Sequence, residues 1–307
     1  MLDLRAPLLL CVEVTTACNL KCKYCYAASN QSHPVKTLSL ETFNEIIKDA
    51  MNIDVFDINI CGGEPFLHKD IEKMISIVLA SNMGITIVSN GTSISKSLAQ
   101  SLYTFGIIPY IQISFDGHNS ELHNITRGMF DQAFSGFKNL VNAAGNINLS
   151  PSVGIVVNKF NYKYIYEIID FFCQYTKRFH IMKVMKHPEL SLNYKETEFF
   201  FSEVIPKMKE LSRQKNLGIS MFDDIYRKLG VMSAEVEQAH IDCLAGYTSL
   251  VISADCSVHP CDIVRNRCFG KWSGVGSLTK IYEKSKEQWK NMKFCWCQNE
   301  KNVSIDM

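Results

Sequence analysis

The 307-residue sequence lacks three features that would place it in particular classes of protein. It has no excess of either charge, because 32 basic and 31 acidic side chains give a formal net charge of +1, with no long run that would bind a polyanion. It has no long apolar run, and its apolar stretch near the start, residues 7–14, is too short for a signal peptide or a membrane span. It has no internal repeat or low-complexity tract. We therefore expect a cytoplasmic globular protein that binds neither nucleic acid nor membranes.

Hydrophobic residues make up 47% of the chain, which is enough to bury a large core, and the length suits one barrel domain with a small appendage. Strand-like runs alternate with segments of helical apolar spacing. The predicted strands are Leu8–Val14, Val55–Cys61, Ile85–Ser89, Tyr110–Ser114, Ser152–Val157 and Phe179–Val184. The predicted helices are Leu40–Met51 with Ser39 as N-cap, Ile71–Ser81, Ala133–Ala143, Tyr162–Tyr175 and Tyr194–Lys215. This alternation predicts an α/β fold with a parallel sheet, either open or curled into part of a barrel.

The pattern changes near Gly230, where the regular alternation gives way to short strands, glycine and cysteine. A β-hairpin is predicted from Leu250–Ile252 and Ser257–His259, followed by a helix near Leu278–Trp289. We therefore place a domain boundary here, with residues 1–230 as the first domain and residues 231–307 as a small cysteine-rich second domain.

Twelve cysteines are many for a compartment in which disulfides are rare, so clusters of them indicate metal binding or redox chemistry. Three lie within residues 18–25 and six lie between residues 243 and 297. Two groups of metal ligands are the simplest account of this distribution. The other three, Cys11, Cys61 and Cys173, are expected to pack as small buried apolar side chains.

The first group is a C-x3-C-x2-C arrangement of Cys18, Cys22 and Cys25 directly after the first predicted strand. Thiolates suit iron-sulfur clusters, and three ligands on a four-iron cube leave one iron open to a ligand that is not protein. A zinc or redox cysteine loop is the alternative. Structural zinc needs four ligands, however, and the nearest further candidate, His33, is expected to be an ordinary loop residue.

This motif resembles the signature of the radical S-adenosylmethionine (SAM) superfamily, in which an aromatic residue, here Tyr24, precedes the third cysteine. Cys61-Gly62-Gly63-Glu64-Pro65, at the end of the second predicted strand, is similar to the G-G-E-P segment that holds the ammonium group of SAM in that family. The resemblance implies this role for Gly62, Gly63 and Glu64.

Polar residues after the later predicted strands resemble further segments of the superfamily. Asn90, Ser114 and Asp116 correspond to residues that line the SAM pocket, although ordinary strand-end turns are the alternative reading. His123 and Arg127 resemble an H-x3-R-G stretch of the subgroup that carries auxiliary clusters, and Asn158 and Asn161 stand where that subgroup also has asparagine. A solvated surface role is equally open for each of these four.

The second group of cysteines resembles the SPASM/Twitch extension that follows the barrel in many radical SAM enzymes. Cys243-Leu244-Ala245-Gly246 opens the pattern, the predicted hairpin leads to Pro260-Cys261, and Cys295-Trp296-Cys297 follows the last predicted helix. The resemblance implies that Cys243, Cys261, Cys295 and Cys297 hold an auxiliary 4Fe-4S cluster in a one-cluster, Twitch-like domain. Zinc is the alternative occupant, because four cysteines also satisfy tetrahedral zinc.

The chain departs from this pattern in two ways. Cys256 stands where the hairpin normally has glycine, and the last pair is C-x-C instead of C-x2-C. Three roles stay open for the surplus Cys256 and Cys268: spare thiols, substitute ligands for Cys295 or Cys297, or donors of a hydrogen atom to a substrate radical. The neighbouring basic residues Arg265, Arg267 and Lys271 are expected to form a solvated face.

The resemblance implies a partial (β/α)6 barrel, similar to a TIM barrel, with a small Twitch-like domain at its C-terminal end. It implies that a reduced cluster cleaves SAM to a 5'-deoxyadenosyl radical that removes a hydrogen atom from the substrate. Flavodoxin or ferredoxin would supply the electron. The combined motifs argue against a non-catalytic iron-sulfur electron carrier and against a zinc-stabilised binding module.

Many enzymes of this subgroup modify ribosomally made peptides, so the resemblance favours a peptide substrate and a crosslink, thioether or epimerised product. A sugar or aminocyclitol dehydrogenase or epimerase is the alternative. Because the chain begins close to its first predicted strand, we expect a leader peptide to be bound by the barrel or by a separate leader-binding protein.

Overall fold

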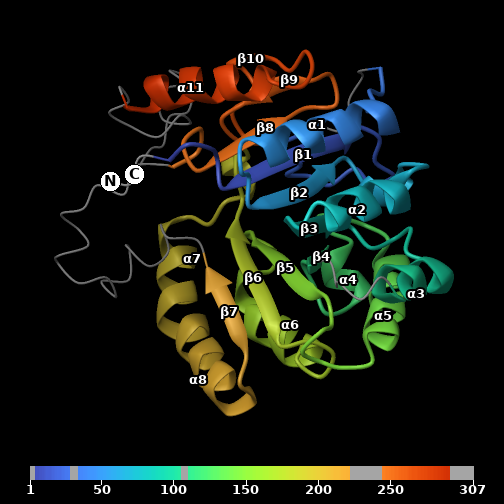
Figure 1. Ribbon diagram of the computed structural model, residues 1–307. Helices are drawn as coiled ribbons and strands as arrows, with labels where there is room; N and C mark the ends of the chain where they lie inside the picture. Colours follow the sequence, from blue (N-terminus) through green and yellow to red (C-terminus); the bar gives the residue numbers. More distant parts are fainter. Residues whose placement is uncertain (1–3, 28–33, 105–109, 222–243, 291–307) are drawn as a thin grey trace. The chain divides into compact units, whose positions relative to one another are not determined.

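The structure is a computed structural model that describes residues 4–27, 34–104, 110–221 and 244–290. It divides into two compact units, whose elements are labelled in Figure 1. The first unit comprises residues 1–19, 26–88 and 241–307, and the second comprises residues 20–25 and 89–240. Cys18 belongs to the first unit, whereas Cys22 and Cys25 belong to the second.

The first unit, in its described residues, is a sheet in the order β10-β9-β8-β1-β2-β3. The strands are β1 (Leu9–Thr15), β2 (Asp57–Gly62), β3 (Gly84–Ser89), β8 (Ser249–Ile252), β9 (Ser257–His259) and β10 (Gly270–Lys271). Strands β8, β1, β2 and β3 are parallel, and β9 and β10 are antiparallel additions at the edge. The helices are α1 (Leu40–Asn52), the 3-10 helix η1 (Pro65–Leu67), α2 (Ile71–Ala80) and α11 (Ser277–Lys290).

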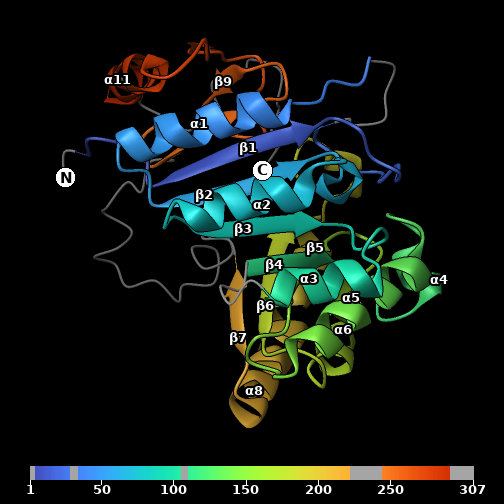
Figure 2. The same ribbon diagram turned by 45° about the vertical axis from the view of Figure 1, so that its right-hand side comes forward.

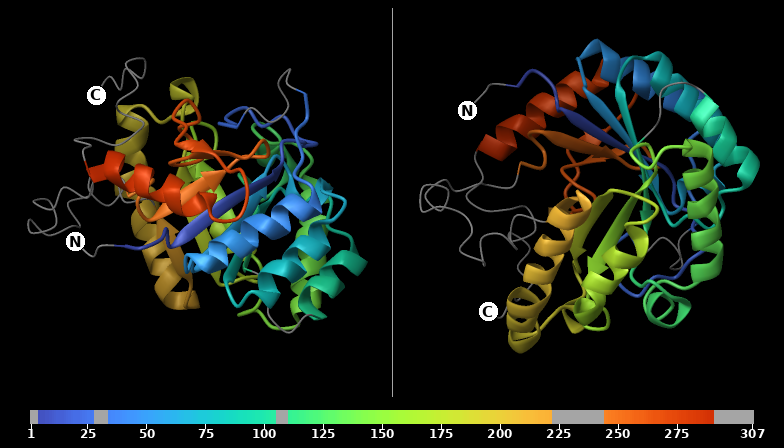
Figure 3. Two further views of the ribbon diagram at one scale, coloured as in Figure 1. Left: turned by 45° about the horizontal axis from the view of Figure 1, so that its top comes forward. Right: turned by 90° about the horizontal axis from the view of Figure 1, so that it is seen from below.

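Helices α1 and α2 follow one face of β1, β2 and β3 (Figure 2), and α11 lies next to α1 (Figure 3, right). The two faces of β1 differ in chemistry, because successive side chains of a strand point to opposite sides. Leu10, Val12 and Val14 are fully buried on one face. Cys11 and Glu13 lie on the other face and are also buried. This second face of β1 is the polar side of the sheet.

The second unit is built on the parallel strands β4 (Tyr110–Ser114), β5 (Ser152–Val157), β6 (Arg178–Lys183) and β7 (Gly218–Met221), in that order. Its α-helices are α3 (Lys96–Thr104), α4 (Ser120–His123), α5 (Phe130–Ala144), α6 (Ile165–Phe172), α7 (Tyr194–Phe199) and α8 (Ile205–Lys215). It also contains η2 (Tyr162–Tyr164), η3 (Pro188–Leu190) and a π-helical turn, η4 (Phe200–Val204). Every residue of β5 is buried, as expected for a central parallel strand.

An aromatic core joins the helices of the second unit to its sheet. Phe115, directly after β4, lies with its ring centroid 5.6 Å from Phe137 of α5 and 4.6 Å from Phe172 of α6. Such ring pairs contribute beyond their buried area. This packing holds the carboxyl end of β4, where Ser114 and Asp116 lie, in a fixed position.

All six predicted strands and the predicted hairpin are confirmed, with ends that differ by two residues or fewer. The N-cap of α1 is confirmed as well, because the Ser39 side chain accepts a hydrogen bond from the Thr42 N–H at 3.0 Å. The mixed α/β class with parallel strands is confirmed.

Among the described residues, no helix is both long enough and apolar enough to cross a bilayer. The boundary placed between residues 230 and 231 lies outside the described residues.

The predicted helix Tyr194–Lys215 differs in one respect, because it consists of α7, the π-helical turn η4 and α8. Pro206 lies just inside α8 and has no N–H, so it cannot donate to the carbonyl four residues earlier, and the helix widens before it. The predicted helix Tyr162–Tyr175 likewise opens with the 3-10 turn η2 and ends at Phe172. Strand β7 was not predicted, because a strand of four residues is too short to give a distinct pattern.

Asp49 of α1 fastens the last described segment of the chain to the first unit. Its carboxylate is fully buried and accepts hydrogen bonds from the Trp272 side chain (2.9 Å) and from the N–H groups of Gly276 (2.7 Å) and Leu278 (3.0 Å). The last two donors lie at the start of α11, where backbone N–H groups have no partner within the helix. A negative charge is also favourable at that end of the helix dipole.

Replacing Asp49 with alanine should lower the free energy of unfolding by about 3 kcal/mol, because three donors, two of them in buried hydrogen bonds, lose their acceptor at once. Asp49→Asn keeps one acceptor oxygen and should cost less. Thermal or urea unfolding followed by circular dichroism measures both changes. Glu45→Ala, at an exposed position of the same helix, is the matched control and should be close to neutral. Equal stability of the Asp49 and Glu45 variants would contradict this account.

Candidate active site

The G-G-E-P segment packs against the chain that leads into the first cysteine motif, and both lie in the first unit. The Gly63 N–H donates to the Thr15 carbonyl at 2.8 Å, and the Glu64 N–H donates to the Ala17 carbonyl at 2.8 Å. A Cβ atom on Gly63 would lie 2.2 Å from the Ala17 oxygen, and Gly62 has a φ of +145°. Only glycine allows this approach of the two backbones. The segment is thereby fixed beside the residue that precedes Cys18.

Glu64 is buried, with 1% of its surface exposed. Its Oε1 accepts a hydrogen bond from the Phe66 N–H at 3.1 Å, so the side chain is the N-cap of η1. This cap holds the carboxylate in place at the carboxyl end of β2. Functional groups of parallel α/β proteins gather at that edge of the sheet.

Cys18, Cys22 and Cys25 are half-buried thiols outside disulfides. Burial raises the pKa of the Cys22 thiol, and the Arg127 guanidinium acts in the opposite direction. Among the described residues, no three His, Cys, Asp or Glu side chains converge on the position of a single metal ion. A four-iron cube does not require such convergence, because each of its cysteines ligates a different iron. Three thiols at this spacing fit a four-iron cluster.

Asp116 is the centre of a buried network in the second unit. Its Oδ2 accepts hydrogen bonds from the Tyr24 hydroxyl and from the Thr126 hydroxyl (2.9 Å). Its Oδ1 accepts from the Val156 N–H (3.1 Å) and forms an ion pair with Arg127 Nε at 3.1 Å. The residue has no exposed surface. Each carboxylate oxygen thus has two protein partners.

The same network holds the loop between Cys22 and Cys25. The Lys23 N–H donates to the Thr126 carbonyl at 2.9 Å, and the Arg127 guanidinium lies 5.3 Å from the centre of the Tyr24 ring. Tyr24 also packs in a small apolar cluster with Val156, Val184 and Leu190. The aromatic residue of the cysteine motif is therefore a buried anchor of the loop.

The remaining polar residues of this unit bond mainly to the backbone around them. Asn90 Oδ1 accepts from the Thr92 N–H at 2.9 Å, and Ser114 is buried at the end of β4. Asn161 donates to the carbonyls of Asp116 (3.1 Å) and Val156 (3.0 Å), and Asn158 Oδ1 accepts from the Phe160 N–H (3.0 Å). Burial lowers the pKa of His123 to about 4. The surface roles left open for His123, Asn158 and Asn161 are therefore wrong, because all three are buried.

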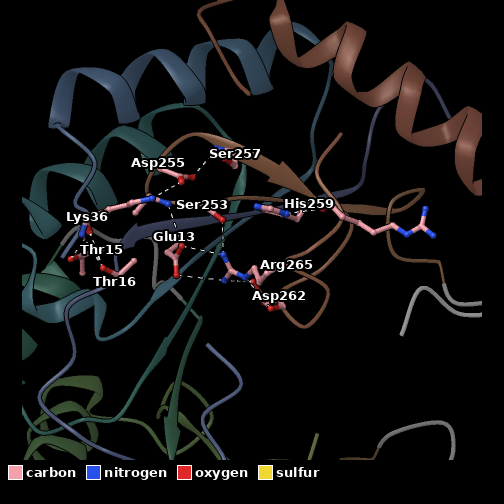
Figure 4. A network of polar contacts seen from close by, with 12 residues as sticks. Glu13, Thr15, Thr16, Lys36, Ser253, Asp255, Ser257, His259, Asp262 and Arg265 are labelled. Carbon is pink, nitrogen blue, oxygen red and sulfur yellow. Dashed lines mark hydrogen bonds and ion pairs between the residues drawn. The ribbon is translucent and has the colours of Figure 1, made fainter. Parts of the chain in front are cut away.

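A second polar network on the polar face of the first unit was not predicted (Figure 4). Arg265 Nη1 donates to Glu13 Oε2 at 3.1 Å and to the Ser253 hydroxyl, and the Ala254 N–H donates to the same Glu13 oxygen at 3.2 Å. Asp262 lies 3.6 Å from Arg265, and burial raises the pKa of its carboxyl group. The expectation of a solvated face is therefore wrong for Arg265, because it is bound to a buried carboxylate. The sequence feature that could have predicted this network is Glu13, an acidic residue within an otherwise apolar strand.

The scattered cysteines are placed as expected in two cases out of three. Cys11 and Cys173 are buried, whereas Cys61 is partly exposed. Cys11 and Cys61 lie on the polar face of the sheet, and burial raises the pKa of both thiols. Their surroundings include the carboxyl group of Asp262, so this face is not purely apolar packing.

Of the second group of cysteines, Cys243, Cys295 and Cys297 lie outside the described residues. Cys261 is half-buried just after β9. Cys256 lies in the turn between β8 and β9 with a φ of +66°, which explains why glycine is usual there. Its carbonyl accepts from the Trp272 N–H at 2.7 Å. The exposed Cys268 instead donates its thiol hydrogen to the Gly270 carbonyl at 3.1 Å.

Known proteins resemble this chain in sequence and in fold. The mycofactocin maturase MftC of Mycolicibacterium smegmatis is 33% identical over 160 residues, which cover 52% of this chain and 40% of that protein. The sporulation killing factor maturation protein SkfB of Bacillus subtilis is 24% identical over 267 residues, covering 85% and 62%. The crystal structure of Streptococcus suis SuiB bound to precursor peptide SuiA has a similar fold, with a TM-score of 0.76 at 19% identity over 94% of this chain and 67% of that chain.

The chain spans about two fifths of the length of the MftC proteins that it matches. A family model described as the radical SAM superfamily matches residues 12–172, which is more than half of the chain. This range contains the C-x3-C-x2-C motif, the G-G-E-P segment and the Asp116 network. The chain belongs to the radical SAM superfamily.

Proposed function

We propose that this radical SAM enzyme modifies a ribosomally made peptide. Membership of the superfamily implies a 4Fe-4S cluster and SAM as cofactors. When both are bound, these cofactors provide the chemistry that removes a hydrogen atom from an unactivated carbon of the substrate. The protein binds and orients these groups and excludes water from them.

The residues that are present fit both cofactors. Cys18, Cys22 and Cys25 are reduced thiols on one short loop and would hold the cluster. Gly62, Gly63 and Glu64 would hold the ammonium group of SAM. The observation that carries the proposal is the pair of backbone hydrogen bonds from Gly63 and Glu64 to Thr15 and Ala17. They fix the SAM-binding segment directly beside the start of the cysteine motif.

Further residues have supporting roles in the proposal. Asn90 and Ser114, at the ends of β3 and β4, would line the SAM pocket. Asp116 and Tyr24 would position the cluster loop, because their polar groups are buried and bonded to each other. A flavodoxin or ferredoxin would reduce the cluster, and a leader peptide would be bound by the barrel or by a separate protein.

Residues 231–307 are proposed to form a Twitch-like domain that follows a partial (β/α)6 barrel of residues 1–230. In this proposal Cys243, Cys261, Cys295 and Cys297 hold an auxiliary 4Fe-4S cluster. We take both surplus cysteines as spare thiols, because Cys268 is exposed and Cys256 lies in the turn between β8 and β9, outside the four positions of the family pattern. The supporting observation is the confirmed hairpin of β8 and β9, which brings the chain to Pro260-Cys261 as the family pattern requires.

The peptide substrate rests on the relatives. MftC and SkfB carry names that describe maturation, and SuiB was crystallised with a precursor peptide. The test is to incubate the anaerobically reconstituted enzyme, SAM and a reductant with a short peptide encoded beside its gene, in ordinary and in deuterated water. We expect a peptide product lighter by two hydrogens, without solvent deuterium, and unchanged activity in Cys256→Ala and Cys268→Ala.

Other outcomes would correct the proposal in a defined way. One solvent deuterium in a product of unchanged composition indicates epimerisation, and loss of that product in Cys256→Ala or Cys268→Ala identifies the hydrogen donor. An unmodified peptide together with conversion of a sugar or aminocyclitol would contradict the peptide substrate.

A further inference from the structure

We propose that the buried pair of Arg127 and Asp116 is a positioning device that sets the reduction potential of the cluster bound by Cys22 and Cys25. This inference rests on the proposed function only in requiring a cluster at the first cysteine motif. The residues concerned all belong to the second unit.

The two charges are strongly shielded from water. Asp116 has no exposed surface, and the Arg127 side chain is 10% exposed. Burial of a single charge is unfavourable, so each of these groups requires the other. Burial acts to lower the pKa of Arg127, but Asp116 and Tyr24 outweigh it and the pKa is raised. The guanidinium is therefore a permanent positive charge in a region of low dielectric.

The pair is connected to the cysteine loop at the residues between its two cysteines. Tyr24 donates to Asp116 and lies beneath the Arg127 guanidinium, and Lys23 is bonded to the carbonyl of Thr126. Cys22 and Cys25 flank these two anchored residues. A cysteine that ligates an iron on this loop is thus held at a fixed separation from the two charges.

The two charges act on Cys22 with opposite signs. Arg127 is positive and Asp116 is negative, and both contact Tyr24, which lies between Cys22 and Cys25. A positive neighbour that stabilises a thiolate also stabilises a cluster that has accepted an electron. Arg127 should therefore raise the reduction potential, and Asp116 should lower it.

Asp116 and Arg127 are positioning residues in this scheme and not substrate contacts. The four partners of the Asp116 carboxylate, Tyr24, Thr126, Val156 and Arg127, satisfy both of its oxygens. A group that is saturated by protein contacts can act on the reaction only through the loop and through its charge.

The experiment measures the midpoint potential of the first cluster in the full reconstituted chain by redox-titrated EPR, without peptide, using the signal that responds to SAM. Arg127→Gln should lower the ratio of reduced to oxidised cluster about tenfold at a fixed applied potential. For a one-electron couple this corresponds to a midpoint potential that is lower by ~59 mV. Asp116→Asn should shift the midpoint in the opposite direction. Arg127→Lys keeps the positive charge, so its midpoint potential should be closer to that of the wild type than the midpoint potential of Arg127→Gln is.

Arg178 offers a matched control in the same unit, because its guanidinium lies 4.5 Å from the Tyr110 ring and donates to the Ser150 carbonyl at 2.6 Å. Arg178→Gln should leave the midpoint unchanged. Shifts of the same sign in Arg127→Gln and Asp116→Asn, or no shift in either with full iron content, would overturn the inference and leave the proposed function intact. If Arg127→Gln binds no iron, Asp116→Asn alone tests the inference. A rise in its midpoint potential supports the inference, and a fall or no change contradicts it. A wild type without a cluster would overturn both proposals.

Discussion

Replacement of Cys18, Cys22 and Cys25 together by alanine should abolish the reductive cleavage of SAM. The wild type, reconstituted anaerobically, should contain about eight irons in two cubes, and the triple variant should keep about four. The reason is that the cleavage requires an iron with an open position, and only a cluster with three protein ligands provides one. Iron analysis and quantitation of 5'-deoxyadenosine by liquid chromatography measure the two effects.

Cys261→Ala is the matched control, because it removes a half-buried cysteine that we assign to the auxiliary site. It should lose the other half of the iron while cleavage of SAM without substrate persists. Continued formation of 5'-deoxyadenosine by the triple variant would refute the assignment of the first cluster. Zinc in place of the second group of irons in the wild type would refute the assignment of the auxiliary cluster.

Gly63→Ala should reduce the cleavage of SAM by about a hundredfold or more, although it adds only a methyl group. The new Cβ atom would lie 2.2 Å from the Ala17 oxygen and 2.6 Å from its carbonyl carbon, both of which are backbone atoms. The backbone of Ala17 must therefore move, and the next residue is Cys18. A displacement of about 1 Å in a site that requires close positioning is sufficient for a loss of this size.

Gly218→Ala makes the same chemical change in β7, where the nearest atom to the added Cβ is the Lys177 oxygen at 3.7 Å, an ordinary contact. It should retain wild-type cleavage. Circular dichroism should show that Gly63→Ala remains folded, and iron analysis should show whether its cluster is retained. Wild-type rates of 5'-deoxyadenosine formation in Gly63→Ala would rule out a close fit between the G-G-E-P segment and the cysteine motif.

The strands and most helices could be predicted because their signals are local. Alternating or continuous apolar residues mark β1 and β5, and Ser39 marks the start of α1 through a bond to a residue three positions away. The first cysteine motif is local for the same reason, because its three thiols lie within eight residues. The interruption at Pro206 could also have been anticipated, because a proline inside a helix removes a hydrogen bond.

The sequence by itself determined the alternation of strands and helices, the cysteine spacing that favours a 4Fe-4S cluster, and the G-G-E-P segment at the end of a strand. Only the tertiary structure decided what the buried charges do. Arg265 is paired with Glu13, 252 positions away, and Asp49 caps a helix whose donor Leu278 is 229 positions away. Asp116 is saturated by groups from three separate places in the chain. The physical reason is that a buried charge must be compensated by whatever the fold brings beside it, and the sequence pattern around the charge carries no record of that distant partner.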